Sequence, residues 1–269
     1  MFEHPDFIVE AAVDGVRVVR LNRPDKLNAQ TIHSMKAFQG LIDAIKDDAD
    51  TRVVILAAEG RGFCAGLELN DALAGVDNAA ASVTDYYRLQ ETFAGVVQRL
   101  RALDKPIVAA VNGAAVGAGF ALSLAADIRV AASRASFHVG AIKIGLSAGE
   151  CGISYHLPRI VGAARAFELM LTGRPIDAQE AERIGLVCNV VEPEALLARA
   201  MEIARAIAAN SPYAVKHTKQ IMWSNLDAPS LDAALELENR TQILALMTED
   251  FREAVAAFRE KRKPVYSGK

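Results

Sequence analysis

The first half of the chain alternates short apolar runs with turn signals. Residues 7–22 hold two runs rich in β-branched side chains on either side of Asp14-Gly15. An Asp-Gly pair readily adopts the positive φ angles of a tight turn, so this stretch predicts an antiparallel hairpin. Apolar side chains then recur at helical spacing over residues 32–48, and Thr31 stands where it can cap that helix.

The next apolar runs are shorter and continuous. Residues 52–58 and 106–112 predict two buried strands, and a helical pattern over about 84–103 separates them. Residues 127–132 and 185–191 predict further strands. Strand, helix and strand in this order indicate parallel pairing, so we expect an α/β fold.

After Val191 the pattern becomes helical throughout, and prolines separate the segments. We therefore expect an α/β core domain over residues 1–192 and a C-terminal helical region over residues 193–269. The helical region keeps an apolar stripe, which must pack on the core or on another subunit. The predicted helices cover residues 193–209, 212–225, 230–247 and 248–262.

Composition narrows the class of protein. The chain has 269 residues, of which 52% are hydrophobic and 23% charged, with a formal net charge of -3. These values argue against a disordered protein and against a nucleic-acid binder that relies on bulk positive charge. Cys64, Cys151 and Cys188 are scattered and form no metal or disulfide pattern. We expect reduced thiols and a cytoplasmic location, because the N-terminus shows no secretory signal.

Residues 107–126 form the one long apolar stretch that raises a membrane-spanning alternative, since twenty residues are nominally enough to cross a bilayer. Asn112, Ser123 and several glycines interrupt the stretch, and Pro106 precedes it. A buried strand, a glycine turn and a buried helix explain these residues better, so no membrane partner is expected.

Two glycine-containing segments each follow a predicted strand, where open parallel sheets place their ligand sites. They are residues 60–70 (GRGFCAGLELN) and residues 112–122 (NGAAVGAGFAL). Free backbone amides from two such segments, facing each other, would stabilise a developing oxyanion. The glycines fit a purely structural role equally well, because they also permit close packing of the backbone.

Two other motifs suggest different chemistry. Gly117 and Gly119 begin a dinucleotide-binding pattern, but Leu122 replaces its third glycine, which argues against a dinucleotide fold. Residues 145–149 (GLSAG) match the nucleophile elbow of serine hydrolases, with Ser147 as the nucleophile. That elbow requires residues 141–144 to form a strand.

The remaining triad partners would be Asp177 and His217, although His217 falls inside a predicted helix. The five histidines show no metal-ligand spacing, so no metal is expected. His138 lies near the second glycine segment and is either a substrate contact or a structural residue. Glu150 is an isolated acid in an apolar loop, where burial would raise its pKa towards a useful acid/base value. Its alternative role is to cap the helix that begins near Gly152.

Five ordered blocks together resemble the crotonase, or enoyl-CoA hydratase/isomerase, family over almost the whole chain. The resemblance implies a crotonase-like spiral of ββα units with a C-terminal helical trimerisation region, assembled as a homotrimer or a dimer of trimers. It also implies an acyl-CoA thioester as substrate and no separate cofactor. The blocks are residues 21–29, 60–69, 105–131, 157–191 and 249–269.

The resemblance also implies roles for individual residues. Leu67, which follows CAG, and Ala118, inside the GAG triplet, are expected to donate two backbone amides to the thioester oxygen. Phe258 and Lys261 resemble residues that reach the CoA of a neighbouring subunit. The positions expected to line the acyl-CoA path are Lys26, Leu27, Ala29, Ala65, Glu68, Leu69, Gly117 and Ala141.

The chain departs from the family's hydratases at two positions. Those enzymes use a pair of glutamates, and this chain has Ala121 and Ala141 instead. Neither alanine can move a proton, so double-bond isomerisation with Glu150 as the sole acid/base is expected rather than hydration. The reaction would belong to fatty-acid or related acyl-CoA metabolism. An acyl-CoA hydrolase and a non-catalytic acyl-CoA binding protein remain as alternatives, and Tyr86, Tyr87 and Phe93 are candidate contacts of the acyl tail.

Overall fold

The N-terminal hairpin begins the main sheet of the computed structural model, which describes residues 2–68 and 82–269. Strands β1 (Phe7–Val9) and β2 (Val16–Leu21) pair antiparallel. Asp14 and Gly15 turn the chain with φ angles of 54° and 77°. The predicted hairpin is therefore confirmed.

The described residues form a six-stranded sheet in the order β1-β2-β3-β4-β6-β9. From β2 onward every neighbouring pair is parallel, as the strand and helix alternation predicts. The additional strands are β3 (Val53–Ala58), β4 (Ile107–Val111), β6 (Ile128–Ala132) and β9 (Asn189–Val191).

The prediction of a strand over 185–191 is wrong for its first half. Only Asn189–Val191 pair with the sheet. Gly185 has a φ of 75°, and it belongs to a turn in which Leu186 and Val187 are buried. A short apolar run indicates that its side chains are buried, but not that they form a strand. Here Leu186 and Val187 are buried in a turn.

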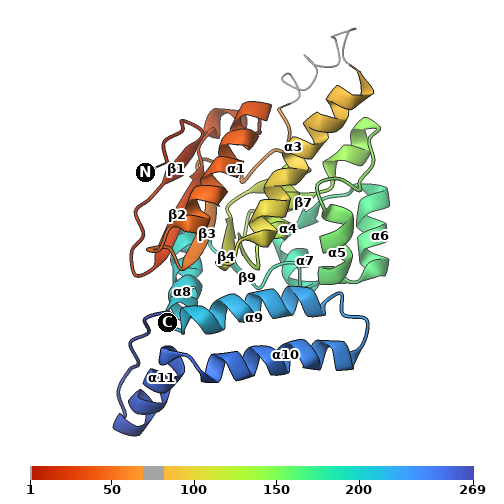
Figure 1. The fold of residues 1–269 in the computed structure, drawn as a ribbon. Helices are drawn as coiled ribbons and strands as arrows, with labels where there is room; N and C mark the ends of the chain where they lie inside the picture. Colours follow the sequence, from red (N-terminus) through yellow and green to blue (C-terminus); the bar gives the residue numbers. More distant parts are fainter. Residues whose placement is uncertain (1, 69–81) are drawn as a thin grey trace.

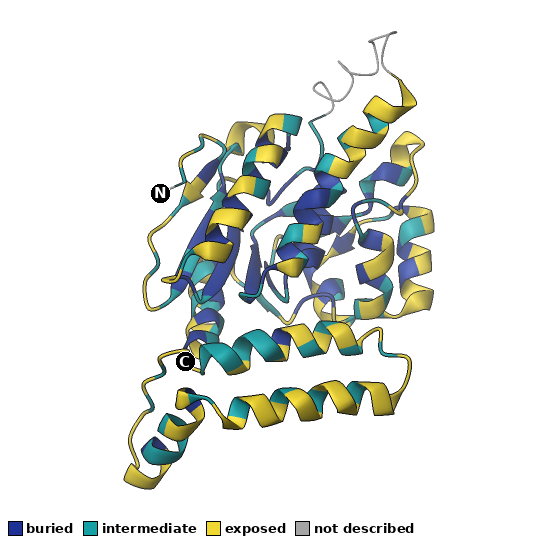
Figure 2. Cartoon of the chain, viewed as in Figure 1, coloured by how far each residue is buried: buried dark blue, intermediate teal, exposed yellow. Residues whose placement is uncertain are grey.

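Helices cover both faces of the sheet (Figures 1 and 2). On one face lie α1 (Ile32–Asp47), α3 (Val83–Ala102) and α4 (Ala118–Ala125), packed in the larger hydrophobic core. Thr31 caps α1 by accepting a hydrogen bond from the Ser34 amide, as predicted. On the opposite face lies α8 (Leu196–Ala208), which follows the short 3-10 helix η3 (Pro193–Ala195) and buries Leu196, Ala200, Ala204 and Ala208 against the strands.

A second, three-stranded sheet stands beside the main one in the order β5-β7-β8. Its strands are β5 (Ala114–Val116), β7 (Ser136–His138) and β8 (Ile176–Asp177). Helix α7 (Ala178–Arg183) packs against β7 and β8, and α5 (Ile153–Val161) and α6 (Ala163–Thr172) pack against each other.

The strand that a serine-hydrolase elbow requires is absent from its expected place. Residues Gly140–Ile144 form a 3-10 helix, η2, instead. Gly145 ends η2 in the left-handed region, and only Ala141 of this helix is buried. The strand interpretation of 141–144 is therefore wrong, because its isoleucines do not enter a sheet.

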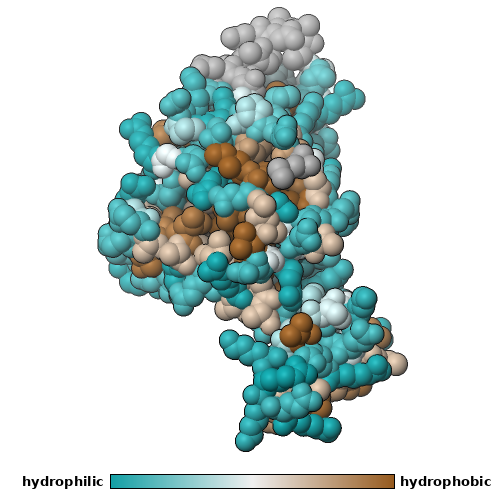
Figure 3. Space-filling model, turned by 90° about the vertical axis from the view of Figure 1, so that its left-hand side faces the viewer, coloured by the Kyte–Doolittle hydropathy of each residue, from teal (hydrophilic) through white to brown (hydrophobic). Residues whose placement is uncertain are grey.

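The C-terminal helices α9 (Pro212–Asn225) and α10 (Leu231–Leu246) form an antiparallel pair below the core, and α11 (Glu249–Glu260) extends beyond it (Figure 1). None of the residues of α10 is buried. On the face shown in Figure 3, hydrophobic side chains gather mainly on the core, and the C-terminal helices are largely hydrophilic. The predicted use of these helices in a trimer stays a prediction, as does the boundary at residue 192.

In the part of the chain that the structure describes, no helix is long and apolar enough to cross a membrane. Residues 107–126 contain β4, β5 and α4 instead. The predicted strand and helix are confirmed, whereas the segment expected to be only a glycine turn includes the short strand β5.

Candidate active site

The two glycine segments lie side by side. The Val116 amide donates a 2.9 Å hydrogen bond to the Cys64 carbonyl, and Cys64 and Ala115 form an isolated parallel β-bridge. At Gly119 an added Cβ would lie only 2.1 Å from the Cys64 carbonyl oxygen. The structural interpretation of the glycines is confirmed at Gly119, which permits the close packing that brings the two segments together.

A cavity of about 380 Å³ opens between these segments, helix α3, and the loop from η2 to α5. Its lining is mainly apolar. The lining residues are Ala65, Gly66, Leu67, Tyr86, Leu89, Gln90, Phe93, Val116, Gly117, Ala118, Gly140, Ala141, Ile144, Leu146, Glu150 and Cys151.

The Gly66-Leu67 peptide has a fixed orientation. The Gly66 carbonyl accepts a 2.7 Å hydrogen bond from the Gln30 amide. The amide hydrogen of a trans peptide points opposite to its carbonyl, so the Leu67 N–H is directed away from Gln30. Gly66 has a φ of 92°, and a Cβ there would lie 2.7 Å from the Val116 carbonyl and 3.5 Å from the Ala118 nitrogen.

The Ala118 amide is the first of helix α4. The Gly117 carbonyl accepts a 2.9 Å bond from the Ala121 amide, which begins the helical ladder and leaves the Ala118 N–H outside it. Among the described residues, neither the Leu67 nor the Ala118 amide has a protein acceptor. Two unpaired donors therefore belong to residues that line one cavity.

Glu150 lies against the second of these segments. Its Oε1 is 3.1 Å from the position that a Cβ on Gly117 would take. Among the described lining residues only Glu150 carries a carboxyl group, and burial raises its pKa. The capping alternative is wrong, because the cap of α5 is Gly152 and no side chain bonds to it.

One face of α3 forms a wall of the cavity. Tyr86, Leu89, Gln90 and Phe93 follow each other at helical spacing and all line it. Tyr86 and Phe93 were expected contacts of the acyl tail, whereas Tyr87 is 67% exposed and does not line the cavity. Leu89 and Gln90 were missed, although the same spacing would have indicated them.

Cys151 is a second residue that the sequence did not indicate. Its thiol is 3.6 Å from the Gln90 Nε2, and burial raises its pKa to about 12. Its φ of 44° and the 82° of Gly152 form the turn that precedes α5. Nothing in the hydrophobic pattern marks this turn.

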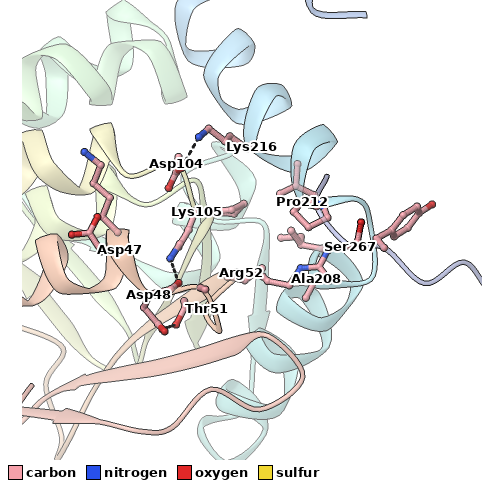
Figure 4. Close-up of a pocket in the computed structure, with 18 residues that line it drawn as sticks. Asp47, Asp48, Thr51, Arg52, Asp104, Lys105, Ala208, Pro212, Lys216 and Ser267 are labelled. Carbon is pink, nitrogen blue, oxygen red and sulfur yellow. Dashed lines mark hydrogen bonds and ion pairs between the residues drawn. The ribbon is translucent and has the colours of Figure 1, made fainter. Parts of the chain in front are cut away.

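A second cavity of about 380 Å³ lies at the C-terminal end of α1, near the start of β3 and the C-terminal residues of the chain (Figure 4). Several of its charged groups have partners within the protein. Lys216 forms a 2.9 Å ion pair with Asp104, and Lys105 donates to the carbonyls of Ile45 and Asp48 (Figure 4). None of the described residues predicted for the site lines it.

Residues 11–269 match a family model described as enoyl-CoA hydratase/isomerase. The chain belongs to the enoyl-CoA hydratase/isomerase family. A probable enoyl-CoA hydratase of Mycobacterium bovis is 42% identical over 263 residues, which cover 97% of this chain and 92% of that protein. The 1,2-epoxyphenylacetyl-CoA isomerase of Escherichia coli is 36% identical over 98% of this chain and 99% of its own.

A solved structure of the family has the same fold as this chain. The crystal structure of a probable enoyl-CoA hydratase/isomerase from Mycobacterium abscessus has a TM-score of 0.89 and 39% identity, covering 98% of this chain and 99% of that chain. The expected crotonase-like α/β fold with a helical C-terminal region is therefore confirmed, and the chain is an enzyme of this family.

Six of the residues that the family resemblance singled out line the first cavity together. Three others lie near it: the Leu27 carbonyl accepts a hydrogen bond from the Ala65 amide, Ala29 is buried in the same loop as Leu27, and the Glu68 amide donates to the Gln30 carbonyl. The six are Ala65, Leu67, Gly117, Ala118, Ala141 and Glu150.

The other predicted residues lie away from the cavity or outside the description. Lys26 is exposed at the end of the 3-10 helix η1 (Pro24–Lys26). Phe258 is 85% exposed and Lys261 ends α11, so neither lines the cavity of its own chain. Leu69 lies outside the described residues.

The serine triad is not assembled. The Ser147 hydroxyl accepts a bond from the Gly149 amide, and Asp177 caps α7 through the Glu180 amide. The His217 ring lies 4.2 Å from that of Tyr213. This alternative is therefore wrong, because all three side chains are engaged elsewhere.

The histidines form neither part of the cavity lining nor a metal site in the described residues. Nε2 of His138 lies 2.9 Å from the Ser136 hydroxyl, and His138 does not line the cavity. Within residues 2–68 and 82–269, no group of three or more His, Cys, Asp or Glu side chains is placed to hold a metal ion.

Proposed function

We propose that this enzyme isomerises the double bond of an enoyl-CoA thioester through an enolate, with Glu150 as its only acid/base. One observation carries the proposal: a single carboxyl group shares a cavity with two residues whose amides have no acceptor among the described residues. The reaction class is one that an oxyanion site and one proton carrier can perform.

The steps follow from this arrangement. The thioester oxygen accepts hydrogen bonds from the Leu67 and Ala118 amides, which stabilise the negative charge that develops on it. The Glu150 carboxylate removes a proton from C2 of a 3-enoyl-CoA, and the electron pair forms the enolate. The same carboxyl group returns the proton to C4, so the product is the 2-enoyl-CoA and nothing is gained or lost.

Two alanines support isomerisation over hydration. Ala121 is fully buried in α4, and Ala141 lines the cavity. Hydration needs a group that activates water and a group that protonates C2, and these side chains can do neither. The Escherichia coli relative is also an isomerase of a CoA thioester by name, but its named substrate is an epoxide rather than an enoyl group.

The proposal also covers how the enzyme binds CoA and how its subunits assemble. Lys26, Leu27, Ala29 and Ala65, with Glu68 and Leu69, would follow the CoA and pantetheine. The exposure of Phe258 supports a role outside its own chain, where it and Lys261 would contact the CoA of a neighbouring copy in a homotrimer or dimer of trimers. The protein would be cytoplasmic and need no cofactor.

Removal of the carboxyl group tests the mechanism. Glu150→Ala is expected to reduce turnover of a 3-enoyl-CoA about 10³-fold, in the middle of the range for loss of a general base. Added formate should restore part of the rate, because it can occupy the space left by the side chain. Ser147→Ala should keep turnover within about twofold, since Ser147 does not line the cavity.

Each contrary result has a specific meaning. Full turnover by Glu150→Ala would exclude Glu150 as the proton carrier. Release of free CoA, lost in Ser147→Ala, would indicate a hydrolase. Binding of acyl-CoA without any product from 2-enoyl or 3-enoyl substrates would indicate a binding protein.

A further inference from the structure

Asn28 is a buried polar residue that lies outside the cavity and that the mechanism does not use. It is fully buried, and with Leu27 it forms a pair of left-handed residues, with φ angles of 58° and 50°. Asparagine tolerates this conformation better than most residues, but it still costs free energy. Such strain persists only where surrounding contacts impose it.

The side chain of Asn28 joins two loops. Its Oδ1 accepts a 2.8 Å bond from the Arg23 amide, within its own loop. Its Nδ2 donates to the carbonyls of Glu59, at 2.9 Å, and Gly62, at 3.0 Å, in the loop that leads to Gly66. Both amide hydrogens and the carbonyl oxygen therefore have partners, which makes this contact costly to lose.

Backbone hydrogen bonds beside Asn28 extend the contact between its loop and the loop that leads to Gly66. Its own carbonyl accepts bonds from the Gln30 side chain and the Cys64 thiol. Residues 27–30 thus run beside residues 64–68, with the Ala65 amide donating to Leu27 and the Gln30 amide donating to Gly66. The last of these bonds sets the direction of the Leu67 N–H.

We propose that Asn28 is a positioning residue that fixes the orientation of the Leu67 amide for the thioester oxygen. It acts through the loops and not on the substrate, because it does not line the cavity. The inference rests on the proposed function in one respect, the use of the Leu67 amide as a donor. A displacement of about 1 Å in a catalytic group can change a rate by about 10²-fold, so a small movement of this loop matters.

The test uses Asn28→Asp and Asn28→Gly. The first keeps the shape and the acceptor for Arg23, but turns an oxygen towards the Glu59 and Gly62 carbonyls. The second keeps the left-handed backbone and removes the side chain, without adding a charge. Asn22→Asp is the matched control, since its Nδ2 donates to the Pro5 carbonyl and not to the glycine loops.

The readout is the infrared band of the thioester carbonyl in bound butyryl-CoA carrying ¹³C at that carbon. Hydrogen bonds from two amides lower this frequency. We expect a clear lowering in the wild type and in Asn22→Asp, and at least half of it lost in both Asn28 variants at temperatures where they are folded. Their kcat should fall about 10-fold or more, with KM changing less.

The outcomes separate this inference from the proposed function. A wild-type carbonyl shift that both Asn28 variants retain in full would overturn the inference alone. A wild-type protein that binds butyryl-CoA without any shift would overturn the role of the amides, and with it both claims. A loss of the shift in the Asn28 variants, alongside an unchanged Glu150 dependence of the chemistry, is the result that supports both.

Discussion

Two of the cavities of this enzyme have the same volume, about 380 Å³, but shift the pKa of a carboxyl group in opposite directions. In the first, burial raises the pKa of Glu150. In the second, hydrogen bonds from Thr51 and Arg17 lower the pKa of Asp48 against the effect of burial. One carboxyl group holds its proton more tightly than usual, and the other less tightly.

The difference shows what marks a reactive site in this fold. The second cavity is richer in charged side chains, and several of them have partners within the protein: Lys216 forms an ion pair with Asp104, and Lys105 donates to the Asp48 carbonyl (Figure 4). The first has fewer polar groups, and among the described residues the Leu67 and Ala118 amides lack protein acceptors. A carboxyl group with a raised pKa beside two backbone amides without acceptors in the described part of the chain, rather than cavity size or charge content, distinguishes the first cavity.

The largest expected effect separates the two carboxyl groups directly. Glu150→Gln should lower kcat/KM for a 3-enoyl-CoA about 10³-fold, because glutamine cannot carry the proton. Asp48→Asn, a matched change in the second cavity, should leave it within about twofold. Steady-state kinetics of both variants measures the contrast, and equal losses would remove the distinction between the cavities.

The next effect concerns the glycine that brings the amides together. Gly66→Ala adds a Cβ 2.7 Å from the Val116 carbonyl at a φ of 92°, so the Leu67 amide must move. A loss of about 10² in kcat is expected, comparable with removal of one oxyanion donor. Gly185→Ala is the control, because its φ is 75° and nothing lies within 4 Å of the added Cβ. Both variants should lose stability, but only the first should lose catalysis.

The pH dependence of the rate should follow Glu150. Burial raises the pKa of this group above its ordinary 4.5, and only the ionised form removes a proton. We expect kcat/KM to fall about tenfold per pH unit below that raised pKa. Asp48→Asn should show the same profile. A profile that stays flat down to about pH 4 would assign the proton transfer to another group.

The smallest effect is on stability, and its sign differs between the cavities. A raised pKa means that ionised Glu150 destabilises the fold as the pH rises through it, so Glu150→Gln should raise Tm at pH 8 by roughly 1–3 °C. A lowered pKa means that ionised Asp48 stabilises the fold above its ordinary 3.8 and loses this effect at lower pH. Asp48→Asn should therefore lower Tm at pH 8 by roughly 2–4 °C. Thermal unfolding at pH 8 measures both changes, and Tm shifts of the same sign in the two variants would contradict the account. At pH 4 the gain in Glu150→Gln should disappear, because Glu150 is protonated below its raised pKa, whereas the loss in Asp48→Asn should persist.

Much of the fold could be predicted because its signals are local. Asp14-Gly15 marks a hairpin and Thr31 marks a helix start, since each residue type satisfies a specific backbone geometry. The error over residues 185–191 has a physical cause, because Leu186 and Val187 are buried by a turn that the periodicity cannot distinguish from a strand.

The site was only partly predictable, because its residues carry local signals but their assembly does not. Glu150 stands out in the sequence as an isolated acid, and the glycine segments stand out as sources of free amides. Their meeting depends on contacts between distant segments, such as Glu150 against Gly117. The left-handed Cys151 that helps to place Glu150 carries no signal in the pattern, since cysteine rarely indicates such a turn.

The most direct test of the central claim is mass spectrometry of a 2-enoyl-CoA and a 3-enoyl-CoA incubated with the wild-type enzyme in heavy water. A single carboxyl group acting beside an oxyanion site predicts exchange of hydrogen for deuterium and interconversion of the two isomers, with no addition of water. The gain of a whole heavy-water molecule would contradict the account, since it would show hydration by a route that neither Ala121 nor Ala141 can provide.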